Sequence, residues 1–140
     1  MGNKSILCGP ESSGQSVKIC NNMLLAVTMA GVSEAFNLAE SLNINPQKLF
    51  DVVSTSSGSC WAVNNYCPIK GVGPFSPADN EFKPGFSSQL MYKDLSLAIA
   101  AAKKNNLNIE FTTNIYEVFS EILKNNQGDK DFSYLKEFLK

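Results

Sequence analysis

Four polar side chains near the start of a long helix-compatible run are the first candidates for chemistry. Gln15, Lys18, Asn21 and Asn22 follow an i, i+3, i+4 spacing, so a helix places them on one stripe. The same side becomes apolar from position 25 onward. A solvated helix face would continue as a polar stripe, whereas a patch that ends after two turns is typical of a cleft wall. We therefore expect Lys18 to be a partly buried amine, suited to act as a general acid/base.

A second candidate segment follows a long proline-rich loop and contains Phe86, Lys93 and Asp94. Its simplest interpretation is structural. Ser87 or Ser88 caps a helix, Phe86 packs against the core, and the two charged residues face solvent. From residue chemistry alone, this interpretation and a functional one both remain open.

Composition excludes several kinds of site. The 140 residues contain no histidine, which removes Ser-His, Cys-His and histidine-metal arrangements. Proton chemistry is left to Lys, Asp, Glu, Tyr or Cys. Four cysteines, at positions 8, 20, 60 and 67, include no CxxC pair, so we interpret them as reduced core thiols. We expect no metal site.

Charge and hydropathy narrow the choice of partners. The net charge is −1 and no basic run occurs, so we expect no nucleic acid partner. The longest stretch nearly free of polar residues, 23–32, is shorter than the roughly 20 residues that cross a bilayer, and we expect no membrane partner. No apolar secretory core follows the first residues. At 140 residues, of which 44% are hydrophobic, one domain with one core is expected.

The pattern of apolar residues and helix breakers predicts an all-α fold, a helical bundle around one long central helix. That helix is expected over 14–42 and is ended by the Asn45-Pro46 breaker. Residues 5–8 read as a short orphan strand at the N-terminus, with no sheet to join. A long loop is expected over 67–86. The remaining helices are predicted at 46–53, 59–66, 87–105, 112–126 and 131–139.

Four segments together resemble the C-terminal domain of the 3-hydroxyisobutyrate dehydrogenases, within the β-hydroxyacid dehydrogenase family. They are GQSVKICNNMLL from Gly14, SSGSCW from Ser56, PADN from Pro77 and GFSSQLMYKDL from Gly85. The likeness extends in order over nearly the whole chain. The Lys-x-x-x-Asn and Lys-Asp-Leu elements are shared with the broader family. The other two segments favour this member over 6-phosphogluconate or tartronate semialdehyde enzymes.

The resemblance implies a domain organisation. Residues 1–12 would be the end of a missing N-terminal Rossmann domain and the interdomain turn. Residues 13–140 would form an all-helical catalytic and dimerisation domain, like the C-terminal domain of 6-phosphogluconate dehydrogenase. Ser12 departs from the family, which often has Gly in this turn. A chain without the Rossmann domain is expected to be inactive alone.

The resemblance also implies the site and the reaction. Lys18 matches the catalytic lysine of the family, and Asn22, with its neighbour Asn21, matches the substrate-binding position. Phe86 matches a residue that lies near the substrate and the nicotinamide. Lys93 matches a lysine that contacts NAD. The expected reaction is the NAD-dependent oxidation of 3-hydroxyisobutyrate to methylmalonate semialdehyde in valine catabolism. A homo-oligomer, dimer or tetramer, is expected in the mitochondrial matrix.

Two alternatives remain at this point. The chain could be a non-catalytic helical dimerisation module. It could also belong to a related β-hydroxyacid dehydrogenase of the tartronate or succinic semialdehyde reductase type. An amine at position 18 favours an enzyme over a module, since an inactive relative has no chemical reason to keep it.

Overall fold

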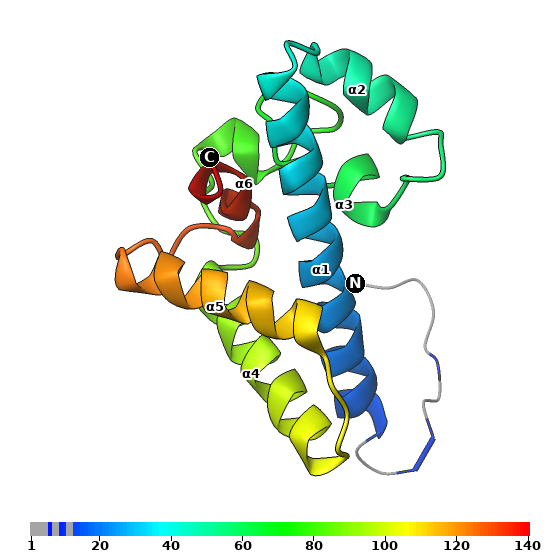
Figure 1. The fold of residues 1–140 in the computed structure, drawn as a ribbon, viewed down its shortest axis with the longest axis vertical. Helices are drawn as coiled ribbons and strands as arrows, with labels where there is room; N and C mark the ends of the chain where they lie inside the picture. The colour runs from blue at the N-terminus through cyan, green and yellow to red at the C-terminus, as the bar shows by residue number, and fades with distance from the viewer. Residues whose placement is uncertain (1–5, 7–8, 11–12) are drawn as a thin grey trace.

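The chain folds into helices (Figure 1). Most connections are short, but the one over residues 65–87 is long, as expected for 67–86, and contains only the 3-10 turn Pro77–Asn80. The computed structural model describes residues 6, 9–10 and 13–140. Apart from one bridge between Ser87 and Asp131, this part of the chain contains no β-structure, so the all-α prediction is confirmed for it. The strand expected at 5–8 lies outside the described residues except for Ile6. The elements are α1 (Ser13–Ser41), α2 (Pro46–Val53), α3 (Trp61–Asn64), the 3-10 turn η1 (Pro77–Asn80), α4 (Ser88–Lys104), α5 (Glu110–Lys124), the 3-10 turn η2 (Phe132–Tyr134) and α6 (Leu135–Phe138).

The 29-residue helix α1 is the longest element, and α2 to α6 all contact it. In Figure 1, α4 and α5 lie along its first half, while α2 and α3 lie beside its second half. Its buried side chains recur at helical spacing and form the centre of the core: Ala26, Met29, Val32, Phe36 and Ala39. By length and composition alone α1 is also able to cross a membrane, a test that core helices of globular domains pass too. The absence of a membrane partner stays a prediction.

Local capping explains where α2 and α4 begin. The Asn45 side chain accepts hydrogen bonds from the backbone N–H groups of Gln47 and Lys48, at 2.9 and 3.2 Å, and Pro46 occupies the first helical position. At α4, the cap is Ser87, whose hydroxyl accepts from the N–H of Leu90 at 3.3 Å. Both helix starts were predicted from these residue types.

Other boundaries differ from the prediction. The helix expected over 59–66 forms only at Trp61–Asn64, and the one expected from 112 begins at Glu110. The segment expected over 131–139 divides into η2 and α6. Its start is fixed by Asp131, whose side chain accepts from the N–H of Ser133 at 3.0 Å and so favours a tight 3-10 turn.

The cysteines differ in exposure. The three described ones are free thiols, in agreement with the prediction of reduced cysteines. Cys67 is buried in the core, and burial raises the pKa of its thiol. Cys20 is exposed, so the interpretation as a core residue is wrong there; it lies at an open hollow between α1 and the C-terminal half of α4. Cys60 is partly buried, and Cys8 lies outside the described residues.

Candidate functional site

Lys18 lies in the second turn of α1, one turn before Asn22. Its side chain is exposed, as are all residues from 14 to 18. The expectation of a partly buried amine is therefore wrong for this chain by itself. The physical reason is that no described element packs over the side chains of residues 14–18, all of which are exposed. The lysine is presented to whatever binds at this end of the helix.

Asn22 connects α1 to α4. Its Nδ2 donates a hydrogen bond of 2.6 Å to Oδ2 of Asp94, and both side chains are half-buried. Because a carboxylate only accepts, the amide nitrogen of Asn22 must face Asp94, which fixes the orientation of the amide. This contact brings together the two segments that carry Lys18 and Lys93. Asp94 was interpreted as a surface charge, and its role in joining the helices was missed.

Lys93 is exposed beside Asp94. Among the described residues, neither the Lys18 amine nor the Lys93 amine forms an ion pair. Two unpaired positive charges at the junction of α1 and α4 suit an anionic ligand, since neither has to leave a partner in order to bind one.

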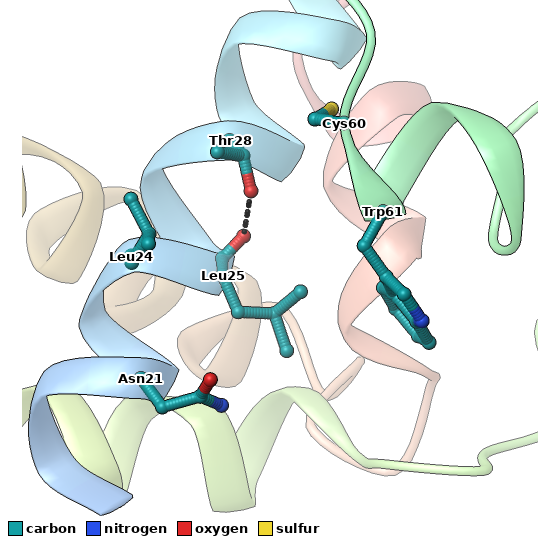
Figure 2. A pocket seen from close by; sticks show the side chains of 6 residues that line it. All are labelled: Asn21, Leu24, Leu25, Thr28, Cys60 and Trp61. Atoms are coloured by element: carbon teal, nitrogen blue, oxygen red, sulfur yellow. Dashed lines mark hydrogen bonds between the residues drawn. The ribbon is translucent and has the colours of Figure 1, made fainter. Parts of the chain in front are cut away.

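A pocket of about 370 Å³ lies between α1 and the start of α3. Figure 2 shows Asn21 and Leu25 pointing from α1 toward Trp61 on the opposite side. The Thr28 hydroxyl donates to the carbonyl of Leu25 at 3.0 Å, so its proton is already used. The pocket is thus largely apolar, and its one amide group, that of Asn21, donates an exposed hydrogen bond of 3.2 Å to Oδ1 of Asn22. It is lined by Asn21, Leu24, Leu25, Thr28, Cys60 and Trp61.

Trp61 and Phe86 are connected by a row of aromatic rings. Trp61 stacks on Tyr66 with ring centroids 5.0 Å apart, and Tyr66 stacks on Phe132 at 5.4 Å. Phe132 in turn meets Phe86 edge to face at 6.0 Å. Sequence reasoning treated Trp61 only as an anchor of its turn. The tight Ser-Ser-Gly turn before it gave no indication that the indole would line a pocket.

Tyr66 is the polar member of this row. Its hydroxyl donates a hydrogen bond of 2.9 Å to Oδ2 of the buried Asp131. Burial and the adjacent carboxylate raise the pKa of Tyr66 well above its ordinary value, so it remains a donor throughout the physiological range.

Comparison with known proteins identifies the family. Residues 12–139 match the family model described as the NAD-binding domain of NADP-dependent 3-hydroxyisobutyrate dehydrogenase. The chain belongs to this family. Its cofactor is accordingly NAD.

Named relatives agree with this assignment. A probable 3-hydroxyisobutyrate dehydrogenase of Mycobacterium bovis is 44% identical over 133 residues, covering 95% of this chain and 45% of the relative. The mitochondrial 3-hydroxyisobutyrate dehydrogenase of Drosophila melanogaster is 39% identical over 140 residues, covering 100% of this chain and 43% of the relative. The chain thus spans less than half the length of these relatives.

Solved structures show the same fold. A structure of the Mycobacterium tuberculosis 3-hydroxyisobutyrate dehydrogenase with L-serine superposes with a TM-score of 0.93 at 42% identity, covering 100% of this chain and 48% of that one. A 3-hydroxyisobutyrate dehydrogenase of Salmonella typhimurium superposes with a TM-score of 0.77 at 24% identity, covering 89% of this chain and 41% of that one, and shows the fold alone.

The described residues fit part of an NAD site. The exposed amine of Lys93 suits the negative charge of a dinucleotide, and Phe86 offers a ring for a flat heterocycle. The sequence has no three-glycine phosphate loop, so the pyrophosphate must be held by other groups. No cluster of three or more potential metal ligands occurs in the part of the chain described. The assigned roles of Lys18, Asn21, Asn22, Phe86 and Lys93 stay predictions.

Proposed function

We propose that this chain is the helical half of an NAD-dependent 3-hydroxyisobutyrate dehydrogenase and that Lys18 is its general acid/base. The observation that carries the proposal is the 2.6 Å hydrogen bond between Asn22 and Asp94. It joins the Lys-x-x-x-Asn segment of α1 to the Lys-Asp segment of α4. The lysine expected to move a proton and the lysine expected to meet the cofactor therefore belong to one site.

Each residue then has a defined task. When bound, NAD would supply the hydride acceptor for oxidation of the alcohol. The Lys18 Nζ takes the hydroxyl proton during oxidation and returns it during reduction. Asn22 uses one N–H on Asp94 and keeps the second for the substrate oxygen, so the substrate is held one turn from the amine. Lys93 supplies positive charge for the cofactor and the substrate carboxylate.

The pocket favours a small hydroxy acid. Its apolar wall suits a methyl-bearing carbon, and the Asn21 amide suits a carboxylate or hydroxyl. We infer that 3-hydroxyisobutyrate is oxidised to methylmalonate semialdehyde, a step of valine catabolism. The Mycobacterium tuberculosis relative is described with L-serine, which is also a 3-hydroxy acid. A related β-hydroxyacid dehydrogenase of the tartronate or succinic semialdehyde reductase type is the nearest alternative.

The chain spans less than half the length of its relatives, which supports a two-domain enzyme. We infer that residues 1–12 are the end of a Rossmann domain and its turn. Residues 13–140 then correspond to a domain like the C-terminal part of 6-phosphogluconate dehydrogenase. The 140-residue chain alone is then inactive, because the pyrophosphate site lies elsewhere. Location in the mitochondrial matrix is proposed from relatives such as the Drosophila enzyme, which is 39% identical, although a bacterial relative matches at 44% identity.

A homo-oligomer, dimer or tetramer, is proposed from the surface of α1. Leu38 and Leu42, near its C-terminal end, are 62% and 60% exposed. Large apolar side chains at such exposure suit a second copy of the chain. The same observation favours the second candidate function, a non-catalytic dimerisation module. Lys18 distinguishes the two, since a module does not need its amine.

Substitution of Lys18 tests the proposal in a complete dehydrogenase that contains this chain. Lys18→Ala should lower kcat by roughly 10²- to 10⁴-fold, the range for loss of a general acid/base. Lys18→Arg keeps the positive charge but cannot release a proton at neutral pH, so it should fail similarly. Lys104→Ala removes an exposed lysine at the far end of α4 and serves as the control. Near-normal turnover by Lys18→Ala would remove this residue from the mechanism.

A further inference from the structure

Asp131 is a fully buried carboxylate beside the loop that carries Phe86. Its Oδ2 accepts three hydrogen bonds: from the Tyr66 hydroxyl at 2.9 Å and from the backbone N–H groups of Gly85 and Phe86, each at 3.0 Å. Its Oδ1 accepts two more from Ser133, from the N–H at 3.0 Å and the hydroxyl at 2.7 Å. Loss of such an acceptor leaves several donors unpaired in the interior.

The position of Phe86 depends on this carboxylate and its neighbour. The N–H of Phe86 donates to Asp131, and its carbonyl accepts from the N–H of Phe132 at 2.9 Å. Its ring meets the Phe132 ring edge to face, with an interplanar angle of 72°. The backbone and the ring of Phe86 are therefore both held by residues 131 and 132.

The position of Trp61 depends on the same carboxylate through Tyr66. Trp61 is 52% exposed, and the Tyr66 ring stacks on one face of its indole with an interplanar angle of 25°. Tyr66 also stacks on Phe132, with an interplanar angle of 23°. The hydroxyl bond to Asp131 prevents the Tyr66 ring from sliding between these neighbours.

We propose, on the basis of the function proposed above, that Asp131 is a positioning residue of the dehydrogenase site. One buried carboxylate sets Phe86 directly and Trp61 through Tyr66. Trp61, which lines the pocket, and Phe86, which is expected near the substrate and nicotinamide, are thereby held in a fixed relation although they come from separate segments of the chain. Asp131 itself is buried and does not touch the substrate, so it acts only through these side chains.

Trp61 provides an optical test, because it is the one tryptophan in the sequence. Tyr66→Phe removes the hydroxyl and keeps the ring. We expect its tryptophan emission to shift to the red and its acrylamide quenching to increase. Tyr116→Phe is the matched control. Tyr116 also stacks on an aromatic ring, at 4.5 Å from Tyr92, and also loses a hydroxyl hydrogen bond, of 2.7 Å. It should leave Trp61 emission unchanged.

Gly85 offers a sharper test. A Cβ at this position would lie 2.8 Å from the Tyr66 hydroxyl oxygen, which cannot move away while it is bonded to Asp131. Gly85→Ala should therefore disturb Trp61 emission in the wild-type background. In the Tyr66→Phe background the clashing oxygen is absent, so Gly85→Ala should add nothing. Additive effects, or no effect of Tyr66→Phe on Trp61, would overturn the inference.

Steady-state kinetics of the complete dehydrogenase test whether Asp131 positions residues of the substrate site. Tyr66→Phe should raise KM roughly fivefold, the factor that one lost hydrogen bond corresponds to, with kcat nearly unchanged. Asp131→Asn keeps only one acceptor oxygen and should raise KM further. If Asp131→Asn does not fold, the Tyr66→Phe and Gly85→Ala variants still test the positioning role of Asp131. An optical change without a change in KM would refute the positioning role. Retained turnover by Lys18→Ala would instead refute the proposed function and leave the optical result standing.

Discussion

The hydrogen bond between Asn22 and Asp94 allows a quantitative prediction. It is short, at 2.6 Å, and its acceptor is a carboxylate, so its net contribution falls within about 1.5–3 kcal/mol. Both side chains are only half-buried, so we place the contribution of this hydrogen bond at the lower end of that range, about 1.5 kcal/mol. Asn22→Ala also gains roughly 0.5 kcal/mol of helix propensity. The expected net loss is about 1 kcal/mol, or a decrease in Tm of about 3 °C for a domain of this size.

The neighbouring residue supplies the control. Asn21→Ala brings the same gain in helix propensity, but its bond to Asn22, at 3.2 Å, is exposed and weak. It should therefore stabilise the chain slightly. The difference between Asn21→Ala and Asn22→Ala then measures the bond itself. Adding Asp94→Ala completes a double-mutant cycle with an expected coupling energy of about 1.5 kcal/mol.

Urea unfolding followed by circular dichroism gives the four free energies of unfolding. A coupling energy within about 0.3 kcal/mol of zero would mean that the two side chains are energetically independent. The reasoning that this bond fixes the junction of α1 and α4 would then be refuted.

Two further outcomes are expected from groups away from the site. Lys136, buried near the C-terminus, donates to Glu40 at 2.7 Å, and this bond lowers the pKa of Glu40 below 4.5. The folded state therefore gains stability above pH 4.5, and this gain is lost as the pH falls through the lowered pKa of Glu40. Glu40→Gln should flatten this part of the curve of unfolding free energy against pH. An unchanged slope in the acid range would contradict the prediction. In thiol labelling followed by peptide mass spectrometry, Cys20 should react in the native state. Cys67 should react only after unfolding, because it is buried and its thiol pKa is raised; equal labelling rates would contradict this.

Much of the helix pattern could be predicted from the sequence because it is set by nearby residues. The Asn45-Pro46 pair and the Ser87 cap act on backbone groups within three or four positions. The length of α1 followed from the absence of proline over 14–42. The shortening of the helix expected at 59–66 did not follow from the sequence: Tyr66 lies outside the helix and its hydroxyl bonds to Asp131, 65 residues away.

The candidate site also contains features that the sequence predicted and features that it did not. The motif residues were found from their types and spacing, and the family likeness they carried is confirmed. Their exposure was not predictable: Lys18 and Cys20, on different sides of α1, are both exposed because the neighbouring elements leave these two side chains uncovered. The partners of Asn22 and Tyr66 were missed for the same reason, since periodicity says which residues share a helix face but not what packs against that face.

The sequence by itself therefore determined the helical class, the main helix starts and the family. These depend on backbone preferences and on contacts within a few residues. Only the tertiary structure decided that Asp94 binds Asn22 from 72 residues away and that Asp131 accepts hydrogen bonds from both Tyr66 and the backbone of Phe86. Such bonds form after distant segments have packed, so their strength and direction are properties of the assembled core and not of any local stretch of chain.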